Sequence, residues 1–300
     1  MRIKFLSGLI ILLGMTCTEI YSQDNTPANN QKTRLFDVSI SLGVWPGGEK
    51  LSSIDDFRVL APESTIFNQP GLDEYIQGEY YNDNSSFFAA QIGIQPFNKK
   101  KNRYGNAVLR FGVSFSESTL LSQSLKNEIR ICFDTLDSES SGELFFIDSI
   151  FQTSITSNYT HQQLGLNASL LFSTDNEARW SLFGGAAVNV NVAIDANTYI
   201  SQVNSSVVVA TWPETNTSYL LSRSPESSTI DERFRNKPDY TVALCIPFGI
   251  DFRMGNKSDF LNRMHLFIEM RPGIQTLIIP GLKPVTQGYF QQYFGVRVRI

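Results

Sequence analysis

Apolar and polar residues alternate with a period of two along much of this 300-residue chain. The last dozen residues show the pattern clearly. Phe294, Val296 and Val298 fall on one side, and Arg297 and Arg299 fall on the other. Because successive side chains of a β-strand point to opposite faces, each alternating segment predicts a strand with one apolar face and one polar face.

Eight segments carry this alternation. Their polar faces are rich in glycine, serine, asparagine, glutamine and charged residues, which suits the interior of a narrow barrel, and their apolar faces suit lipid. About ten residues is also the length of a transmembrane β-strand. The segments are residues 36–45, 86–97, 106–115, 162–172, 180–199, 239–253, 264–274 and 289–300.

The connections between these segments alternate between short and long. Short polar turns follow the second, fourth and sixth segments, whereas long connections occupy residues 46–85, 116–160 and 200–238. Short turns on the periplasmic side and long loops outside are the layout of outer-membrane barrels. We therefore predict an all-β fold: an eight-stranded antiparallel up-and-down transmembrane β-barrel with long extracellular loops.

The N-terminus reads as an export signal. Two basic residues precede an apolar run at 9–13 that is too short to span a bilayer, and Ser22 suits the cleavage position. No later apolar run approaches the roughly 20 residues of a membrane helix. The predicted organisation is a signal peptide at 1–22, a flexible N-terminal segment at 23–34 and a barrel at 35–300, with the mature protein in the bacterial outer membrane.

Composition excludes several classes of function. The net charge is −4, and no basic patch suggests nucleic acid. Cys17 leaves with the signal, while Cys132 lies in a predicted loop and Cys245 in mid-strand, so no disulfide framework is expected. His161 and His265 have no neighbouring ligands at metal-site spacing. We assign no catalytic residue, no metal and no cofactor.

The segment IPFGIDFR (246–253), the terminal YFGVRVRI and the Ser22–Gln23 junction together resemble outer-membrane β-barrel proteins of the Bacteroidetes type. The architecture is similar to the eight-stranded transmembrane domain of outer membrane protein A. This resemblance covers residues 35–300 and implies a location and a form, with no single activity. It implies outer-membrane lipid and the barrel insertion machinery as partners. Ile300 departs from it, because many such barrels end in an aromatic residue.

Eight charged residues fall on the predicted interior face. Glu269 lies on the strand next to Arg297 and Arg299, so we expect it to approach one of them. The set suits either an anion-selective passage or a salt-bridged plug. We expect the plug, because an eight-stranded barrel leaves no aqueous channel. The residues are Asp37, Arg110, Asp251, Arg253, Glu269, Arg271, Arg297 and Arg299.

The long connections are the other place for function. Two β-prone runs at 129–134 and 143–151 predict that the third and fourth strands continue beyond the membrane as a hairpin. Apolar loop residues suggest either a surface that binds a protein or glycan ligand or a cap in which they pack together. These residues are Phe57, Ile66, Phe67, Tyr75, Tyr80, Tyr81 and those at 207–212.

The favoured function is a non-enzymatic outer-membrane protein that is structural or binds through its loops. One alternative is a component of an envelope secretion or surface-attachment assembly. A second is a loop-rim lipid or peptide hydrolase built around His161 with Ser157 or Thr160, and a third is a small pore. A fourth is a secreted soluble β-barrel ligand carrier, which would bury the Leu244 and Phe248 face and expose the arginines.

Overall fold

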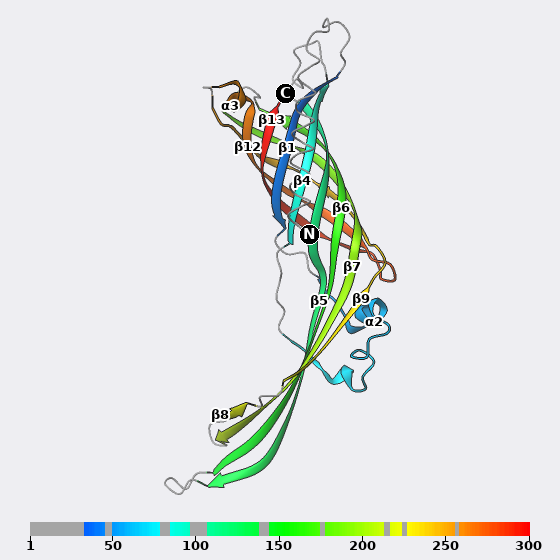
Figure 1. Cartoon of the computed structure of the whole chain (residues 1–300), viewed down its shortest axis with the longest axis vertical. Coiled ribbons are helices and arrows are strands. Elements are labelled where there is room, and N and C mark those ends of the chain that lie inside the picture. Colours follow the sequence, from blue (N-terminus) through cyan, green and yellow to red (C-terminus); the bar gives the residue numbers. More distant parts are fainter. Residues whose placement is uncertain are drawn as a thin grey trace, which may run out of the picture.

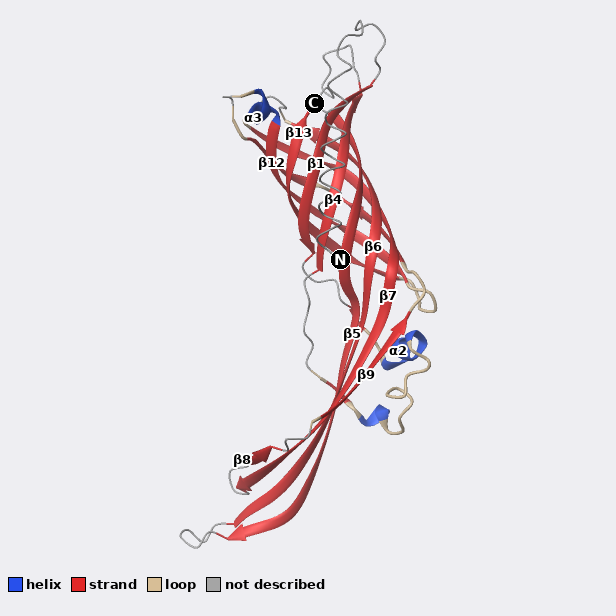
Figure 2. Ribbon diagram, viewed as in Figure 1, coloured by secondary structure: helices blue, strands red, loops and turns tan. Residues whose placement is uncertain are grey.

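The strands of this chain form one closed antiparallel sheet, shown by a computed structural model (Figures 1 and 2). The ring runs β1–β4–β5–β6–β7, then β10 and β11 together, then β12 and β13, and β13 pairs back onto β1. The structure describes residues 33–45, 50–78, 85–96, 107–137, 144–174, 178–212, 217–223, 227–255 and 258–300.

The ring strands differ greatly in length. Three of them, β5, β6 and β7, have 30 residues or more, whereas the others have 15 or fewer. Their bounds are β1 (Thr33–Trp45), β4 (Ser85–Pro96), β5 (Ala107–Asp137), β6 (Leu144–Ser173), β7 (Trp180–Trp212), β10 (Tyr240–Cys245), β11 (Phe248–Arg253), β12 (Met264–Ile278) and β13 (Val285–Arg299).

Over the residues that the structure describes, the sheet has thirteen strands where the alternation predicted eight. Segment 239–253 is divided into β10 and β11 at Ile246 and Pro247, and both parts pair with β7 and β12. Proline has no backbone N–H to donate to a ladder, which interrupts the strand there. Four short strands add to β5 or β7 outside the ring: β2 (Lys50–Leu51), β3 (Ile76–Gln77), β8 (Thr217–Arg223) and β9 (Ser228–Arg235).

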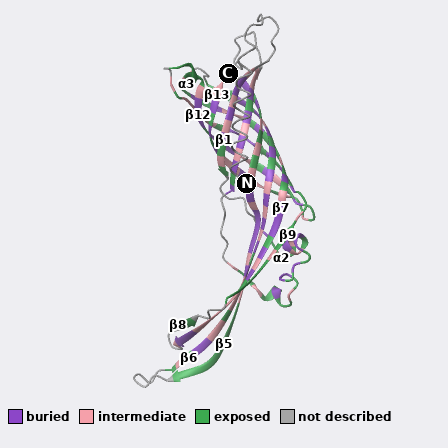
Figure 3. Ribbon diagram, in the orientation of Figure 1, coloured by how far each residue is buried: buried purple, intermediate pink, exposed green. Residues whose placement is uncertain are grey.

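Exposed and buried residues alternate along the ring strands (Figure 3). The exposed side chains are mostly apolar, whereas polar side chains and a few aromatic ones fill the interior. Along β7, Leu182 and Val190 are 57% and 48% exposed, whereas Asn189 is buried. The outward alternation continues through β10 and β11, where Leu244 is 56% and Phe248 45% exposed. A soluble carrier requires the reverse arrangement, so the structure contradicts that alternative.

Beyond one end of the ring, β5, β6 and β7 continue together as a long twisted ribbon (Figure 1). Its outer part, which we call the arm, comprises residues 127–137, 144–153 and 204–212 together with β8. Ile131 pairs with Ser149 there. The predicted hairpin continuation of the third and fourth strands is therefore confirmed, and β7 extends with them.

Residues 50–78 fold into a cap beside the base of this ribbon (Figure 1). Helix α2 (Ile54–Leu60) begins with a capping box in which Ser53 and Asp56 satisfy each other's backbone N–H groups. A single turn of 3-10 helix, η1 (Leu72–Glu74), follows. At the opposite end of the barrel the short helix α3 (Asp259–Arg263) leads into β12. No helix among the described residues is long and apolar enough to cross a membrane.

The cap is held by an apolar core at the mouth of the barrel. Phe57 and Phe67 are almost fully buried and stack with their ring centroids 6.1 Å apart. Ile66 is buried with them, and Tyr75 packs against the cluster. These loop residues thus pack as a cap, the second of the two sequence interpretations. Tyr80 and Tyr81 lie outside the described residues. The other main contributors are Leu60, Leu72, Leu120, Leu121, Leu125, Ile155, Tyr159, Ile200, Leu277 and Ile279.

Candidate functional site

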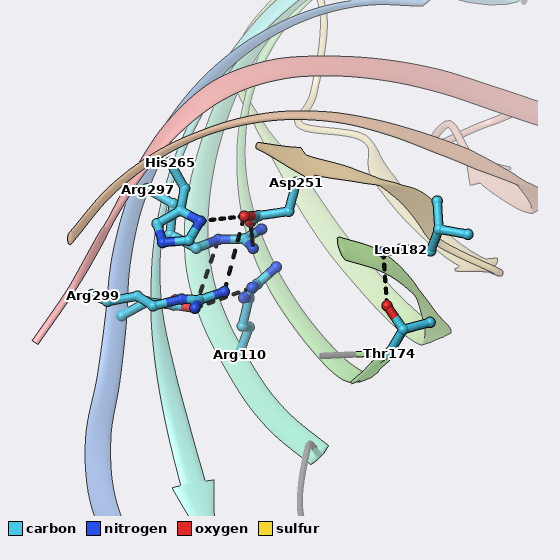
Figure 4. Close-up of polar contacts among 8 residues, drawn as sticks. Arg110, Thr174, Leu182, Asp251, His265, Arg297 and Arg299 are labelled. Carbon is cyan, nitrogen blue, oxygen red and sulfur yellow. Dashed lines mark hydrogen bonds and ion pairs between the residues drawn. The ribbon is translucent and has the colours of Figure 1, made fainter. Parts of the chain in front are cut away.

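The barrel interior at the short-turn end holds a cluster of arginine and aspartate side chains (Figure 4). Asp37 of β1 accepts a hydrogen bond of 3.1 Å from Nη2 of Arg110 on β5, and Nε of Arg297 lies 3.6 Å from the same carboxylate. Asp251 of β11 accepts from Nη1 of Arg297 and is bonded to Nδ1 of His265. Side chains from five ring strands, β1, β5, β11, β12 and β13, thereby meet across the lumen.

Two further arginines extend this cluster. Nη2 of Arg299 lies 3.9 Å from Asp251, and the side chain of Arg253 on β11 has its Nε buried in the same region. The structure therefore gathers six of the eight residues singled out in the sequence. Gly93 makes room for them, because a Cβ there would lie 2.4 Å from Oδ1 of Asp37.

The other two residues form a separate pair one layer deeper. Nε of Arg271 donates to Glu269, its neighbour on the same face of β12, and Nη1 donates to the Tyr293 hydroxyl over 3.1 Å. The guanidinium also lies 4.1 Å from the centroid of the Tyr293 ring. The expected approach of Glu269 to Arg297 or Arg299 on β13 is replaced by this pairing. Arg271 is almost completely buried, so the contact compensates a costly charge.

Amide side chains fill the next part of the lumen. Gln91 donates to Asn167 over 3.0 Å, and Asn189 donates to the Tyr289 hydroxyl over 3.2 Å. Gly165 faces this layer, where a Cβ would lie 1.9 Å from the Asn191 side-chain oxygen. Such close packing is expected of a barrel whose interior is just wide enough for its own side chains.

A second polar network lies at the mouth, under the cap. His161 of β6 contacts Asp239 through Nδ1 at 2.9 Å and Ser118 of β5 through Nε2 at 2.7 Å. Asp239 also accepts from the Tyr159 hydroxyl at 2.9 Å and from Nε2 of Gln163 at 2.8 Å. Sequence reasoning singled out His161 but expected a serine or threonine beside it in the chain. Only the cross-strand register brings Ser118 opposite it.

The order Ser118–His161–Asp239 is that of a serine hydrolase triad, in which the histidine bridges the hydroxyl and the carboxylate. All three residues are buried, and Asp239 has no exposed surface. Four cavities between the described residues are lined by other side chains. Tyr159, His161 and Gln163 together satisfy the Asp239 carboxylate, as expected of a buried structural network.

Polar contacts also fasten the cap to the ribbon. Glu232 of β9 accepts hydrogen bonds from the Ser64 and Thr65 hydroxyls and from the Thr65 backbone N–H. Asn236 donates to the Leu60 carbonyl over 2.7 Å. Partial burial raises the pKa of Glu232, but these hydrogen bonds outweigh it and hold the pKa below its ordinary value. Glu232 therefore holds the cap best when ionised.

The arm exposes apolar side chains far from the ring. Ile129, Ile131 and Phe151 are 54%, 50% and 48% exposed. On the other face, Asp148 accepts from Nε of Arg130 over 2.9 Å. Burial raises the pKa of Asp148, but the hydrogen bonds from Arg130 and Thr211 bring it below the ordinary value. The face of the arm that carries Asp148 is therefore held by polar contacts, whereas the face that carries Ile129, Ile131 and Phe151 exposes large apolar side chains.

The two cysteines of the described residues occupy opposite environments. Cys132 is exposed on the arm, and Cys245 is buried inside the ring beside Asn189. No group of three or more histidine, cysteine, aspartate or glutamate residues in the described ranges could hold a metal ion. A crevice of about 390 Å³ lies between α2 and residues 277–285, with Asp55, Asp56 and Lys283 on its walls.

Comparison with known proteins adds little to this geometry. No family model and no curated protein matches the chain. Two solved structures of Ail, the attachment invasion locus protein of Yersinia pestis, align with it, one of them in complex with the heparin analogue sucrose octasulfate. They share 11% and 10% identity, with TM-scores of 0.23 and 0.21, over 89% of this chain and 100% of theirs. Because these TM-scores are too low to support an argument, the fold is assigned from the geometry of the sheet alone.

Proposed function

We propose that this chain is a non-enzymatic outer-membrane β-barrel protein that binds partners through its extracellular arm and cap. The observation that carries the proposal is the reversed polarity of the ring. Its outer face is covered by exposed leucine, isoleucine, valine and phenylalanine, whereas its lumen holds charged and amide side chains. Only lipid makes such an outer face favourable over a whole ring of strands.

The extent of the apolar band matches a bilayer. Outward apolar positions run along β7 from Leu182 to Ile194. At about 3.4 Å per residue this is roughly 40 Å along the strand, which at a tilt of about 45° is close to the 25–30 Å of a membrane core. Trp180 is exposed at one end of this stretch and packs against Phe252 in a tilted arrangement, with ring centroids 4.4 Å apart. Aromatic residues at such a level suit the membrane interface.

Cell fractionation followed by gel electrophoresis tests the location. We expect the protein in the outer-membrane fraction, with unboiled and boiled samples migrating differently because the folded barrel survives detergent. Recovery in the soluble fraction, with one migration position for both samples, would overturn the proposal.

The arm and cap would face outward, on the side opposite α3 and the C-terminus (Figure 1). The natural cysteines make this testable. A membrane-impermeant maleimide applied to intact cells should label exposed Cys132 and leave buried Cys245 unmodified. A Cys132→Ser variant should lose all labelling. If Cys132 reacts only after the outer membrane is opened, the arm lies on the periplasmic side and the proposed orientation is wrong.

The chemistry of the arm favours a protein partner over an acidic glycan. Exposed Ile129, Ile131 and Phe151 offer apolar contact area outside the membrane. The described cap, residues 50–78, has five acidic and two basic residues, which disfavours polyanions there. An envelope secretion or surface-attachment assembly would present such a protein partner, so this alternative remains within the proposal.

Photo-crosslinking tests binding through the arm. A benzophenone amino acid at Ile131 should give protein adducts on whole cells, whereas the same probe at Ile250 should not, because Ile250 lies on the outer face of the ring. Both positions are about half exposed, which makes them a matched pair. Equal absence of adducts at both positions would indicate that the barrel is structural and that the arm binds no protein.

A further inference from the structure

The polar cluster at the short-turn end has more positive than negative charge. Its arginines are Arg110, Arg253, Arg297 and Arg299, and its carboxylates are Asp37 and Asp251. Guanidinium groups keep their charge in proteins. The nearby pair Glu269–Arg271 is balanced. Four arginines therefore share two carboxylates, which leaves the described residues of this cluster with an excess of two positive charges.

The same arginines have N–H groups with no hydrogen-bond partner. They include Nε and Nη1 of Arg110, Nε and Nη2 of Arg297, and Nε of both Arg253 and Arg299, all of them buried. Aromatic rings cover part of this surface, since the Arg297 guanidinium lies 4.6 Å from the Phe267 centroid and 5.3 Å from that of Phe183. A buried donor without an acceptor costs about 1–3 kcal/mol, and more when it is charged.

A cavity lies where three of these arginines meet. Arg110, Arg297 and Arg299 line it together with Ser181 and the apolar side chains of Phe36 and Phe183. Its volume is about 10 Å³, which is room for one particle the size of a water molecule. The excess positive charge, the unpartnered N–H donors and the cavity therefore lie at the same place in the lumen.

We propose that this cavity binds a single chloride ion. Chloride is larger than a water molecule, so the Arg299 side chain, which is 17% exposed, would shift outward to admit it. The anion would accept hydrogen bonds from the N–H groups of Arg110, Arg297 and Arg299, and it would neutralise part of the excess positive charge. A water molecule could accept the same bonds but would leave the charge uncompensated. Sulfate, phosphate and carboxylates are too large for the volume. The site goes beyond the proposed function, since it concerns the barrel lumen and does not depend on the arm or its partners.

Thermal unfolding of the purified, detergent-folded barrel tests this site. At equal ionic strength, the unfolding midpoint should be higher in sodium chloride than in sodium gluconate, and it should rise with chloride concentration, because the anion binds only the folded state. Arg299→Gln should reduce the chloride effect, because it removes one of the three guanidinium groups that would bind the ion. Arg299 is chosen because it is the least buried of the three and its replacement disturbs the fold least. Arg58→Gln, at a half-exposed arginine in the cap, is the matched control and should keep the full effect.

Crystals soaked in bromide provide the direct observation. Anomalous density is expected between Arg110, Arg297 and Arg299, and it should be absent from the Arg299→Gln protein. If that variant fails to fold, Arg110→Gln provides the same comparison at another arginine that lines the cavity. Equal midpoints in chloride and gluconate, an unchanged chloride effect in the variant, or no bromide at the cavity would each overturn the proposal. None of these results bears on the membrane location.

Discussion

The reversed polarity of the ring makes a sharp prediction for one substitution, Leu166→Arg. Leu166 lies on the outer face of β6, between Val113 and Val190 on the neighbouring strands, and is 67% exposed. In a soluble protein, replacing a side chain this exposed by arginine changes stability by about 0.5 kcal/mol or less. On the lipid face of a barrel the same change costs about 2–4 kcal/mol.

The difference is large enough to measure. A cost of about 2–4 kcal/mol lowers the folding equilibrium constant by roughly 30-fold to nearly 1,000-fold. The barrel would be folded into lipid vesicles and titrated with denaturant, with the folded fraction read from the heat-dependent gel shift. Leu221→Arg is the matched control, because Leu221 is 54% exposed but belongs to β8 of the arm, outside the proposed membrane span. We expect it to change stability by about 0.5 kcal/mol or less. Equal effects of the two substitutions would refute the assignment of the ring surface to lipid.

Three further predictions concern the cap and the mouth. Phe57→Ala should weaken cap docking by about 3–5 kcal/mol, as expected for a fully buried ring, and should raise hydrogen exchange across 50–78, whereas exposed Val59→Ala should not. Glu232 has a lowered pKa, so its contribution is present above its ordinary pKa of 4.5 and is lost as the pH falls through the folded-state value. Protection of the cap amides against hydrogen exchange should therefore fall in acid. The Glu232→Gln variant should show this lower protection already at neutral pH. If the variant loses protection in acid to the same extent as the unmodified protein, other groups cause the effect. Ser118 should not react with a fluorophosphonate probe, because it is buried in a structural network; labelling that is lost in Ser118→Ala would show a reactive serine instead.

The faces of the strands could be predicted from the sequence because they depend only on a period of two. Leu244, Ile246 and Phe248 alternate with smaller or polar residues, and all three lie on the outside of the ring. The same rule placed eight charged residues on the predicted interior face, and six of them, including Asp37 and Arg297, are buried in the structure. Alternation persists across Pro247, so it did not reveal that proline divides the segment into β10 and β11.

The pairing of those charges depends on the register of strands distant in the chain, which no local pattern encodes. Arg297 reaches Asp251 over 46 residues of sequence, while Glu269 turns to Arg271, two positions away. Both choices depend on which side chains meet in the lumen after the ring closes.

The two-faced character of each strand follows from the amino-acid sequence alone, because side-chain direction is a local property of the backbone. In contrast, the meeting of Ser118, His161 and Asp239 at the mouth depends on the tertiary structure, as does the burial of Phe57 in the cap. The tertiary structure also decided that β7 extends into the arm beside β6. Each of these depends on contacts between distant segments, whose geometry is set by the closure and register of the whole sheet.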